Sequence, residues 1–168
     1  MSIVNSQSSI RVLGLDPGYA RCGWGIVDYK GDTSYVAHGC FETSKDEKFE
    51  NRLKSIGEEL EKVIEEFKPD RIAVEELFFA KSTTTALKVC HARGVLLFIA
   101  AKFEIPVDEM KPSQVKQGLT GYGKADKSQM QMMVKLQLKL QEIPQPDDAA
   151  DALAVAIVGA VCHRSLAL

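Results

Sequence analysis

Carboxylate side chains gather at the start of an apolar segment near the C-terminal end of the chain. Asp147, Asp148 and Asp151 follow the proline-containing stretch 144–146 and precede the apolar run 152–157. Proline is favoured at or before a helix start and the run favours helix, so these aspartates lie in a first helical turn. Asp148 and Asp151, three residues apart, then share one helical face at the positive end of the macrodipole.

Two interpretations of this aspartate group stay open on its own residues. Capping is the simpler one, because Asp is common in the first turn of a helix. One carboxylate is enough to cap, however, and the helix that follows is too apolar for the protein surface. Clustered carboxylates on a buried helix indicate a bound cation that offsets their repulsion. Asp147 is the residue we expect to keep the capping role.

Two more acids stand where predicted strands end. Asp16 follows the apolar stretch 10–15, and Glu75 closes the stretch 71–75. Neighbouring parallel strands lie ~4.8 Å apart, so acids at equivalent ends can share a cation. Side chains alternate along a strand, so Glu75 and Glu76 point to opposite faces of the sheet. The two-residue period alone does not show which of them belongs to the site. Four hard oxygen donors suit Mg²⁺, with Mn²⁺ as a substitute, and one or two ions fit such a set.

A lysine-rich stretch supplies the opposite charge. Residues 111–140 hold six lysines and a single acid, although the whole chain has a net charge of −2. A solvated face is the simple interpretation, but Lys116, Lys124 and Lys127 can also hold phosphates beside the acids. The sequence offers no obvious nucleophilic side chain beside these lysines and the carboxylates. This combination favours metal-assisted phosphodiester hydrolysis. Phe78 can stack on or wedge between bases.

The glycine-punctuated segment 118–124 imitates a nucleotide-binding phosphate loop. In that loop the lysine is followed by Ser or Thr, which holds magnesium, whereas Ala125 stands here. No apolar strand precedes the segment either. We therefore interpret it as a loop that delivers lysines to phosphates.

Hydrophobic periodicity predicts an α/β domain. Three strands joined by short turns form an antiparallel meander, at 10–15, 22–29 and 34–41. A helix over 49–67 leads into the strand 71–75, a crossover that favours parallel pairing with the first strand. An edge strand is expected at 105–108. The remaining helices are expected at 82–103, 112–117 and 126–141, and the first of these is apolar on more than one side.

Length and composition indicate one domain. The chain has 168 residues, 45% of them hydrophobic and 26% charged, which suits a single core over 10–164 after a disordered tail at 1–9. The four cysteines are singly spaced, typical of reduced thiols. The longest apolar run falls short of the ~20 residues that a membrane span needs. We expect a cytoplasmic protein without a membrane partner.

Taken in order, these motifs resemble the RuvC family of Holliday-junction resolvases, from about Arg11 to His163. The residues that carry the resemblance are Asp16-Pro17-Gly18 with Gly23 and Gly25, Ala73-Val74-Glu75 with Phe78 and Ala80-Lys81, Ala92-Arg93-Gly94, Lys111-Pro112, Gln114-Val115-Lys116, Lys127-Ser128-Gln129 and Asp148-Ala149-Ala150-Asp151-Ala152-Leu153-Ala154.

The resemblance implies a ribonuclease-H-like fold, with a five-stranded mixed sheet flanked by helices. It implies Mg²⁺-dependent paired incisions at four-way DNA junctions that leave 5′-phosphate and 3′-hydroxyl ends, by a homodimer that works with RuvA and RuvB. The acidic catalytic and metal residues that it implies are Asp16, Glu75, Asp148 and Asp151, and the DNA-binding candidates are Lys116, Lys127, Lys124, Phe78 and Lys81. The apolar helix 82–103 is the expected subunit interface.

Two other classes of function remain as alternatives. A non-cleaving junction-binding scaffold would need the lysines but not the complete acidic set. An ATP-binding domain of the actin-like or sugar-kinase type shares a glycine-rich first hairpin, but such proteins enclose the nucleotide between two domains. Mg²⁺-dependent cleavage would exclude the scaffold. Equilibrium binding of ATP would support the ATP-binding domain.

Overall fold

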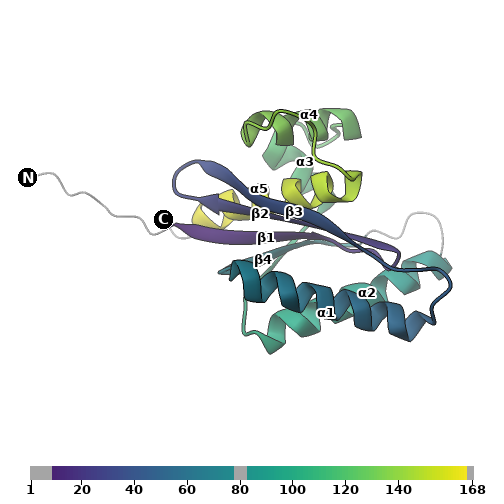
Figure 1. Cartoon of the computed structure of the whole chain (residues 1–168). Helices are drawn as coiled ribbons and strands as arrows, with labels where there is room; N and C mark the ends of the chain where they lie inside the picture. Colours follow the sequence, from purple (N-terminus) through teal and green to yellow (C-terminus); the bar gives the residue numbers. More distant parts are fainter. Residues whose placement is uncertain (1–8, 78–82, 166–168) are drawn as a thin grey trace, which may run out of the picture.

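The computed structural model describes residues 9–77 and 83–165 and contains one five-stranded sheet (Figure 1). Its strands are β1 (Ile10–Asp16), β2 (Arg21–Tyr29), β3 (Thr33–Glu42), β4 (Arg71–Glu75) and β5 (Val107–Met110), in the spatial order β3-β2-β1-β4-β5. β1, β2 and β3 pair antiparallel, whereas β4 pairs parallel with both β1 and β5. The predicted mixed sheet, with its parallel β1–β4 pair, is confirmed.

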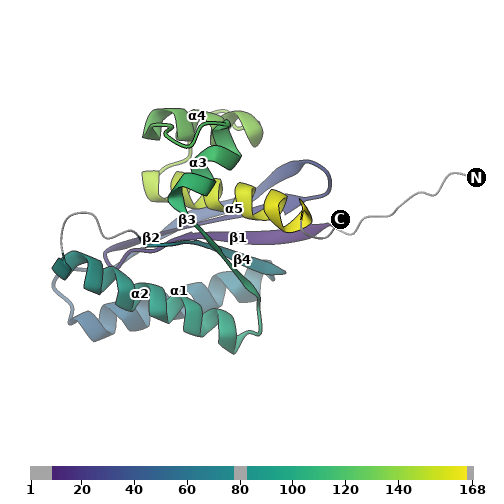
Figure 2. The same ribbon diagram turned by 180° about the vertical axis from the view of Figure 1, so that it is seen from behind.

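Helices cover both faces of this sheet (Figures 1 and 2). On one face lie α1 (Phe49–Phe67) and α2 (Thr83–Lys102); the other carries α3 (Pro112–Thr120), α4 (Lys127–Gln137) and α5 (Asp147–Ser165). Side chains alternate along β1, so Val12 belongs to the core beneath α5 while Leu13 belongs to the core beneath α1 and α2. Both cores are apolar and buried, and together they hold the strand ends in place.

Glycines let α5 lie directly against the backbone of β1 and β2. A Cβ atom on Gly23 would stand 1.9 Å from the carbonyl oxygen of Asp148, and one on Gly14 would stand 2.1 Å from that of Ala152. Side chains at these positions would push the helix away from the sheet. The strand glycines therefore mark close backbone approach, one of the roles expected for them.

The predicted element boundaries differ from the observed ones most clearly in β5, α3 and α4. β5 begins two residues later than 105, and α3 continues beyond residue 117 to Thr120. α4 ends at Gln137 rather than near 141. It ends there because Lys139 adopts the left-handed conformation, with φ of 54°, and the Leu140 N–H bonds back to the Lys135 carbonyl. Glycine is the usual residue at such a position, so the lysine gave no stop signal.

α2 is apolar and only partly covered. By length and composition its segment Thr84–Lys102 is apolar enough to cross a membrane, with a mean hydropathy of 1.3, but core helices of other proteins pass the same test. Its inner side contributes Leu96 and Ile99 to the core shared with α1 and the sheet. On the outer side Leu87 is 54% exposed and Phe98 is 66% exposed. The open apolar side needs a covering surface.

The predicted domain, 10–164, stays a prediction. The predicted tail at 1–9 lies outside the described residues except for Ser9.

Candidate active site

A cavity of about 230 Å³ opens beside the C-terminal end of β4. Its walls carry two carboxylates and two ammonium groups from four different elements, namely Glu75 on β4, Lys116 on α3, Lys127 on α4 and Asp151 on α5. Pro112, Val115, Met130 and Ala154 complete the lining. Carboxylates and ammonium groups that line the same cavity suit a ligand that brings both a cation and a phosphate.

The strands bring Asp16 to the same place. Leu15 pairs with Val74 in the parallel β1–β4 ladder, so Asp16 and Glu75 are the next residues of the two strands. In the antiparallel ladder Asp16 lies opposite Gly23, whose missing side chain admits the backbone of Asp148. The tight packing of α5 therefore sets the first turn of the helix beside the strand ends.

Mutual repulsion among these acids is visible in their pKa values. Burial, followed by the charges of Asp151, Glu75 and Asp148, raises the pKa of Asp16 from 3.8 to about 8. Burial and the charge of Asp151 also raise the pKa of Glu75, although Lys116 opposes the rise. The pKa of Asp151 is raised by burial and by its acidic neighbours, against the opposing effect of Lys127. A bound cation would relieve this repulsion.

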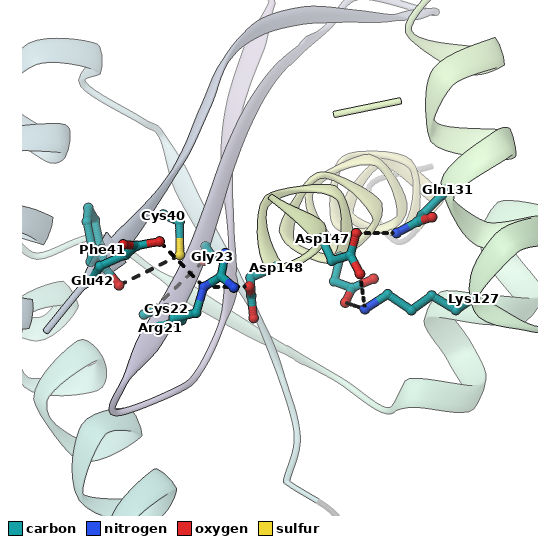
Figure 3. A network of polar contacts seen from close by, with 11 residues as sticks. Arg21, Cys22, Gly23, Cys40, Phe41, Glu42, Lys127, Gln131, Asp147 and Asp148 are labelled. Atoms are coloured by element: carbon teal, nitrogen blue, oxygen red, sulfur yellow. Dashed lines mark hydrogen bonds and ion pairs between the residues drawn. The ribbon is translucent and has the colours of Figure 1, made fainter. Parts of the chain in front are cut away.

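Side chains of the protein already supply two positive charges at the helix start (Figure 3). The Arg21 Nε atom lies 3.2 Å from a carboxylate oxygen of Asp148, and the Lys127 Nζ atom lies 3.4 Å from one of Asp151. Partial burial lowers the pKa of Lys127, but its hydrogen bond to Asp147 and the charge of Asp151 outweigh that effect and raise it. Lys127 therefore stays protonated at neutral pH.

The acids suit a divalent ion that shares its coordination with a substrate. Within residues 9–77 and 83–165, no group of three or more Asp, Glu, His or Cys side chains is arranged to hold an ion by itself. Mg²⁺ commonly binds through one or two carboxylates, several waters and substrate phosphates, rather than in an all-protein cage. The hard oxygen donors and their unrelieved repulsion fit that mode of binding.

The structure chooses between the two adjacent glutamates at the C-terminal end of β4. Glu75 lines the cavity. Glu76 continues the chain beyond the strand, where its N–H donates to the carbonyl oxygen of Met110. Glu75 is thus the residue placed to join a metal site.

Other predicted site residues lie elsewhere. Lys124 is exposed on the loop between α3 and α4 and does not line the cavity. Phe78 and Lys81 fall outside the described residues. The capping role expected for Asp147 is wrong, because its carboxylate oxygens contact side chains of α4: Oδ1 accepts from Gln131 and Oδ2 pairs with Lys127.

Two residues of the site were missed as specific contacts. The sequence motifs assign no role to Arg21, yet its guanidinium contacts Asp148 and Glu42. Gln131 was not singled out, although it lies four residues after Lys127 and hence on the same side of α4. The four-residue spacing shows that Lys127 and Gln131 are neighbours on a helix. It does not show which element of the fold they contact.

Comparison with known proteins identifies first a class and then a family. A mixed five-stranded sheet with helices on both faces and acids at the ends of β1 and β4 defines the ribonuclease-H-like class. Residues 12–163 match the family model described as "Crossover junction endodeoxyribonuclease RuvC". The chain therefore belongs to the RuvC family, whose nucleases are in general metal-dependent.

Individual relatives are similar along nearly their whole length. The chain is 52% identical to the RuvC of Thermotoga petrophila over 157 residues, which cover 93% of this chain and 95% of that protein. It is 50% identical to the RuvC of Heliobacterium modesticaldum over 156 residues, covering 92% and 94% of the two chains.

Solved structures agree with this family assignment. Thermus thermophilus RuvC in complex with a Holliday junction substrate matches with a TM-score of 0.89 and 37% identity over 93% of this chain and 96% of that one. The yeast mitochondrial Holliday junction resolvase matches with a TM-score of 0.68 at 14% identity over 94% and 82%, a likeness of fold alone.

Proposed function

We propose that this chain is an endonuclease that resolves four-way DNA junctions by Mg²⁺-dependent phosphodiester hydrolysis, in DNA recombination and repair. The observation that carries the proposal is the cavity that Glu75 and Asp151 line together with Lys116 and Lys127. Its support is the family membership together with the junction substrate bound by the similar Thermus thermophilus protein.

The residues of the cavity divide the work between chemistry and binding. Asp16, Glu75, Asp148 and Asp151 hold Mg²⁺, with Mn²⁺ as a substitute. One or two ions would supply an activated water and would stabilise the leaving oxygen. Lys116 and Lys127, which line the same cavity, contact the phosphate and hold it beside the acids. Lys124 lies farther out and contacts the DNA backbone along its path.

A synthetic four-way junction tests the function directly. The protein is incubated with the junction and with a linear duplex of the same sequence, in Mg²⁺ and in EDTA. We expect cleavage of the junction alone and only in Mg²⁺, at nicks that DNA ligase reseals because the ends are 5′-phosphate and 3′-hydroxyl. Equal cutting of both substrates would indicate a general nuclease. Binding without cutting would favour the junction-binding scaffold, and equilibrium binding of ATP would favour the nucleotide-binding alternative.

We also propose that the protein works as a homodimer through α2. A hollow of about 590 Å³ on its open side is lined by Leu53, Leu87, Cys90, His91, Gly94, Val95 and Phe98. A second copy would cover this apolar surface, and a two-fold axis would present two equivalent sites to the two strands of a junction. Replacing Phe98 with Asp should yield monomers by light scattering and turn paired incisions into single nicks. A dimeric Phe98→Asp variant that still makes paired incisions would reject this interface.

Two further expectations come from the family resemblance. The RuvA and RuvB branch-migration proteins are proposed partners, and co-purification of the three proteins on junction DNA tests this. We propose a cytoplasmic location, which cell fractionation tests.

A further inference from the structure

Three polar side chains join α4 to the start of α5 outside the predicted metal ligands (Figure 3). Gln131 Nε2 donates to Asp147 Oδ1 at 3.0 Å, and Lys127 Nζ lies 3.1 Å from Asp147 Oδ2. Lys127 and Gln131 are four residues apart, so both project from the same side of α4. Each oxygen of a single carboxylate is thus engaged by a different residue of one helical face.

The same ammonium group also reaches the acids of the site. Lys127 Nζ lies 3.4 Å from Asp151 Oδ2, and Asp147 stands one helical turn before Asp151 on α5. Lys127 therefore lies between an acid that lines the cavity and an acid that does not.

Packing alone does not hold this lysine in place. Its side chain is 55% exposed, and a lysine carries its charge on a flexible four-carbon stem with many rotamers. By contrast α4 itself is anchored, since Met130 and Val134 are buried in the core that it shares with α5. Exposed ion pairs add little to stability. The contact of Asp147 with Lys127 therefore acts on where the ammonium lies, rather than on whether α4 docks.

We propose that Asp147, itself oriented by Gln131, is a positioning residue that holds the Lys127 ammonium at the cavity wall for the DNA phosphate. The proposal rests on the proposed nuclease function. It concerns a residue that is not a metal ligand, and it assigns a shared task to Asp147 and Gln131. A mispositioned lysine would slow the chemical step while leaving most of the DNA contacts intact.

The test compares single-turnover cleavage of a four-way junction by variants at these positions. Asp147→Asn keeps an acceptor for Gln131 but removes the charge opposite Lys127, and we expect its rate to fall about tenfold with little change in junction affinity. The cleavage rate of Gln131→Ala should also fall, by a smaller factor. In a Lys127→Met background, Asp147→Asn should cause no further loss, because the residue that it positions is gone.

Asp32→Asn is the matched control. Asp32 pairs with Lys139 at 3.6 Å, also on the surface, so the substitution removes the same charge from a similar contact away from the cavity. We expect its cleavage rate to equal that of the parent. A second readout needs no cleavage: acetylation of Lys127, followed by mass spectrometry, should be several-fold faster in Asp147→Asn than in the parent or in Asp32→Asn.

The outcomes distinguish a failure of the positioning role from a failure of the proposed nuclease function. If the parent protein cuts no junction, the proposed function fails. If the parent cuts and Asp147→Asn cuts equally fast, the positioning role is rejected and the function stands. An equal loss in the presence and absence of Lys127, or a loss matched by Asp32→Asn, also rejects it. Unchanged acetylation of Lys127 in Asp147→Asn rejects it as well.

Discussion

The acids at the strand ends and the acids at the start of α5 meet in one site but have different surroundings. Asp16 and Glu75 leave the centre of the sheet partly buried, and burial is the largest cause of the raised pKa of each. Asp148 and Asp151 begin a helix, where Arg21 and Lys127 contact their carboxylates directly. Within residues 9–77 and 83–165 no ion pair reaches Asp16 or Glu75, whereas each carboxylate of the other pair contacts a side-chain cation.

This difference indicates which pair depends more on a bound ion. A cation at the strand ends relieves repulsion in a partly buried place, where charges interact strongly. A cation at the helix start must compete with a guanidinium and an ammonium group. In the proposed metal site the strand ends would thus provide most of the gain from metal binding, and the helix start would adjust it.

The largest effect is expected from neutralising the strand-end acids. Asp16→Asn and Glu75→Gln should each lower junction cleavage by at least about a thousandfold, because charge stabilisation by the metal contributes several kcal/mol to the transition state. Asp151→Asn should abolish cleavage as well. Junction affinity in EDTA should stay near that of the parent, since the lysines are unchanged. Gel assays with and without Mg²⁺ measure both; retained Mg²⁺-dependent cutting in all three variants contradicts the assignment of the site.

A side chain at residue 23 should separate the two acidic pairs. In Gly23→Ala the new Cβ would stand 1.9 Å from the Asp148 carbonyl oxygen, so α5 has to move. We expect a loss of about 1–3 kcal/mol in the free energy of unfolding. Cleavage should fall by about tenfold or more, since small displacements of reacting groups are costly.

Gly123→Ala is the control for this substitution, because its Cβ would have no heavy atom nearer than 3.5 Å. Denaturant unfolding and single-turnover cleavage compare the two variants. Equal stability and activity of Gly23→Ala and the parent would show that the close approach is not required.

Stability should depend on pH through Asp16 in the metal-free protein. Its pKa is 3.8 in the reference state and about 8 in the folded protein, so between those values the folded state keeps a proton that the unfolded state has released. The free energy of unfolding therefore falls as pH rises from about 4 to about 8. In Asp16→Asn this contribution is absent.

Thermal unfolding in EDTA at pH 5 and pH 8.5 measures the difference. The melting temperature of the parent should drop more than that of Asp16→Asn, by about 3 °C or more, the effect of roughly 1 kcal/mol in a chain of this length. If the melting temperatures of the parent and of Asp16→Asn drop equally, Asp16 does not carry the pH dependence. The distinction between the two acidic pairs would then be lost.

The smallest effect is expected at Arg21. It competes with a metal ion for Asp148, so Arg21→Gln should lower the Mg²⁺ concentration for half-maximal cleavage, by less than about fivefold because the pair is exposed. Arg21→Lys keeps the charge and serves as the control. A higher Mg²⁺ requirement in Arg21→Gln would contradict competition and would indicate a contact with DNA.

Residue types and local periodicity predict much of this molecule. Turn signals and apolar spacing predict that β1 and β4 end at Asp16 and Glu75. They also predict the parallel β1–β4 pair and a helix that starts near Asp148. The end of α4 does not follow, because Lys139 takes a backbone conformation that glycine usually adopts. The open side of α2 was expected from its apolar circumference, whereas α5, equally apolar, is almost wholly buried.

The sequence by itself determined which acids stand at element ends and which stretch carries the lysines, since both properties are local. Periodicity left Glu75 and Glu76 open, and the tertiary structure places Glu75 in the lining of one cavity with Asp151. Only the tertiary structure decided that Asp147 contacts Lys127 rather than capping its own helix. The physical reason is that these choices depend on how closely α5 approaches β2 and on how α4 docks beside it. Contacts between residues far apart in the chain set both distances, through the missing side chain of Gly23 and the buried face of α4.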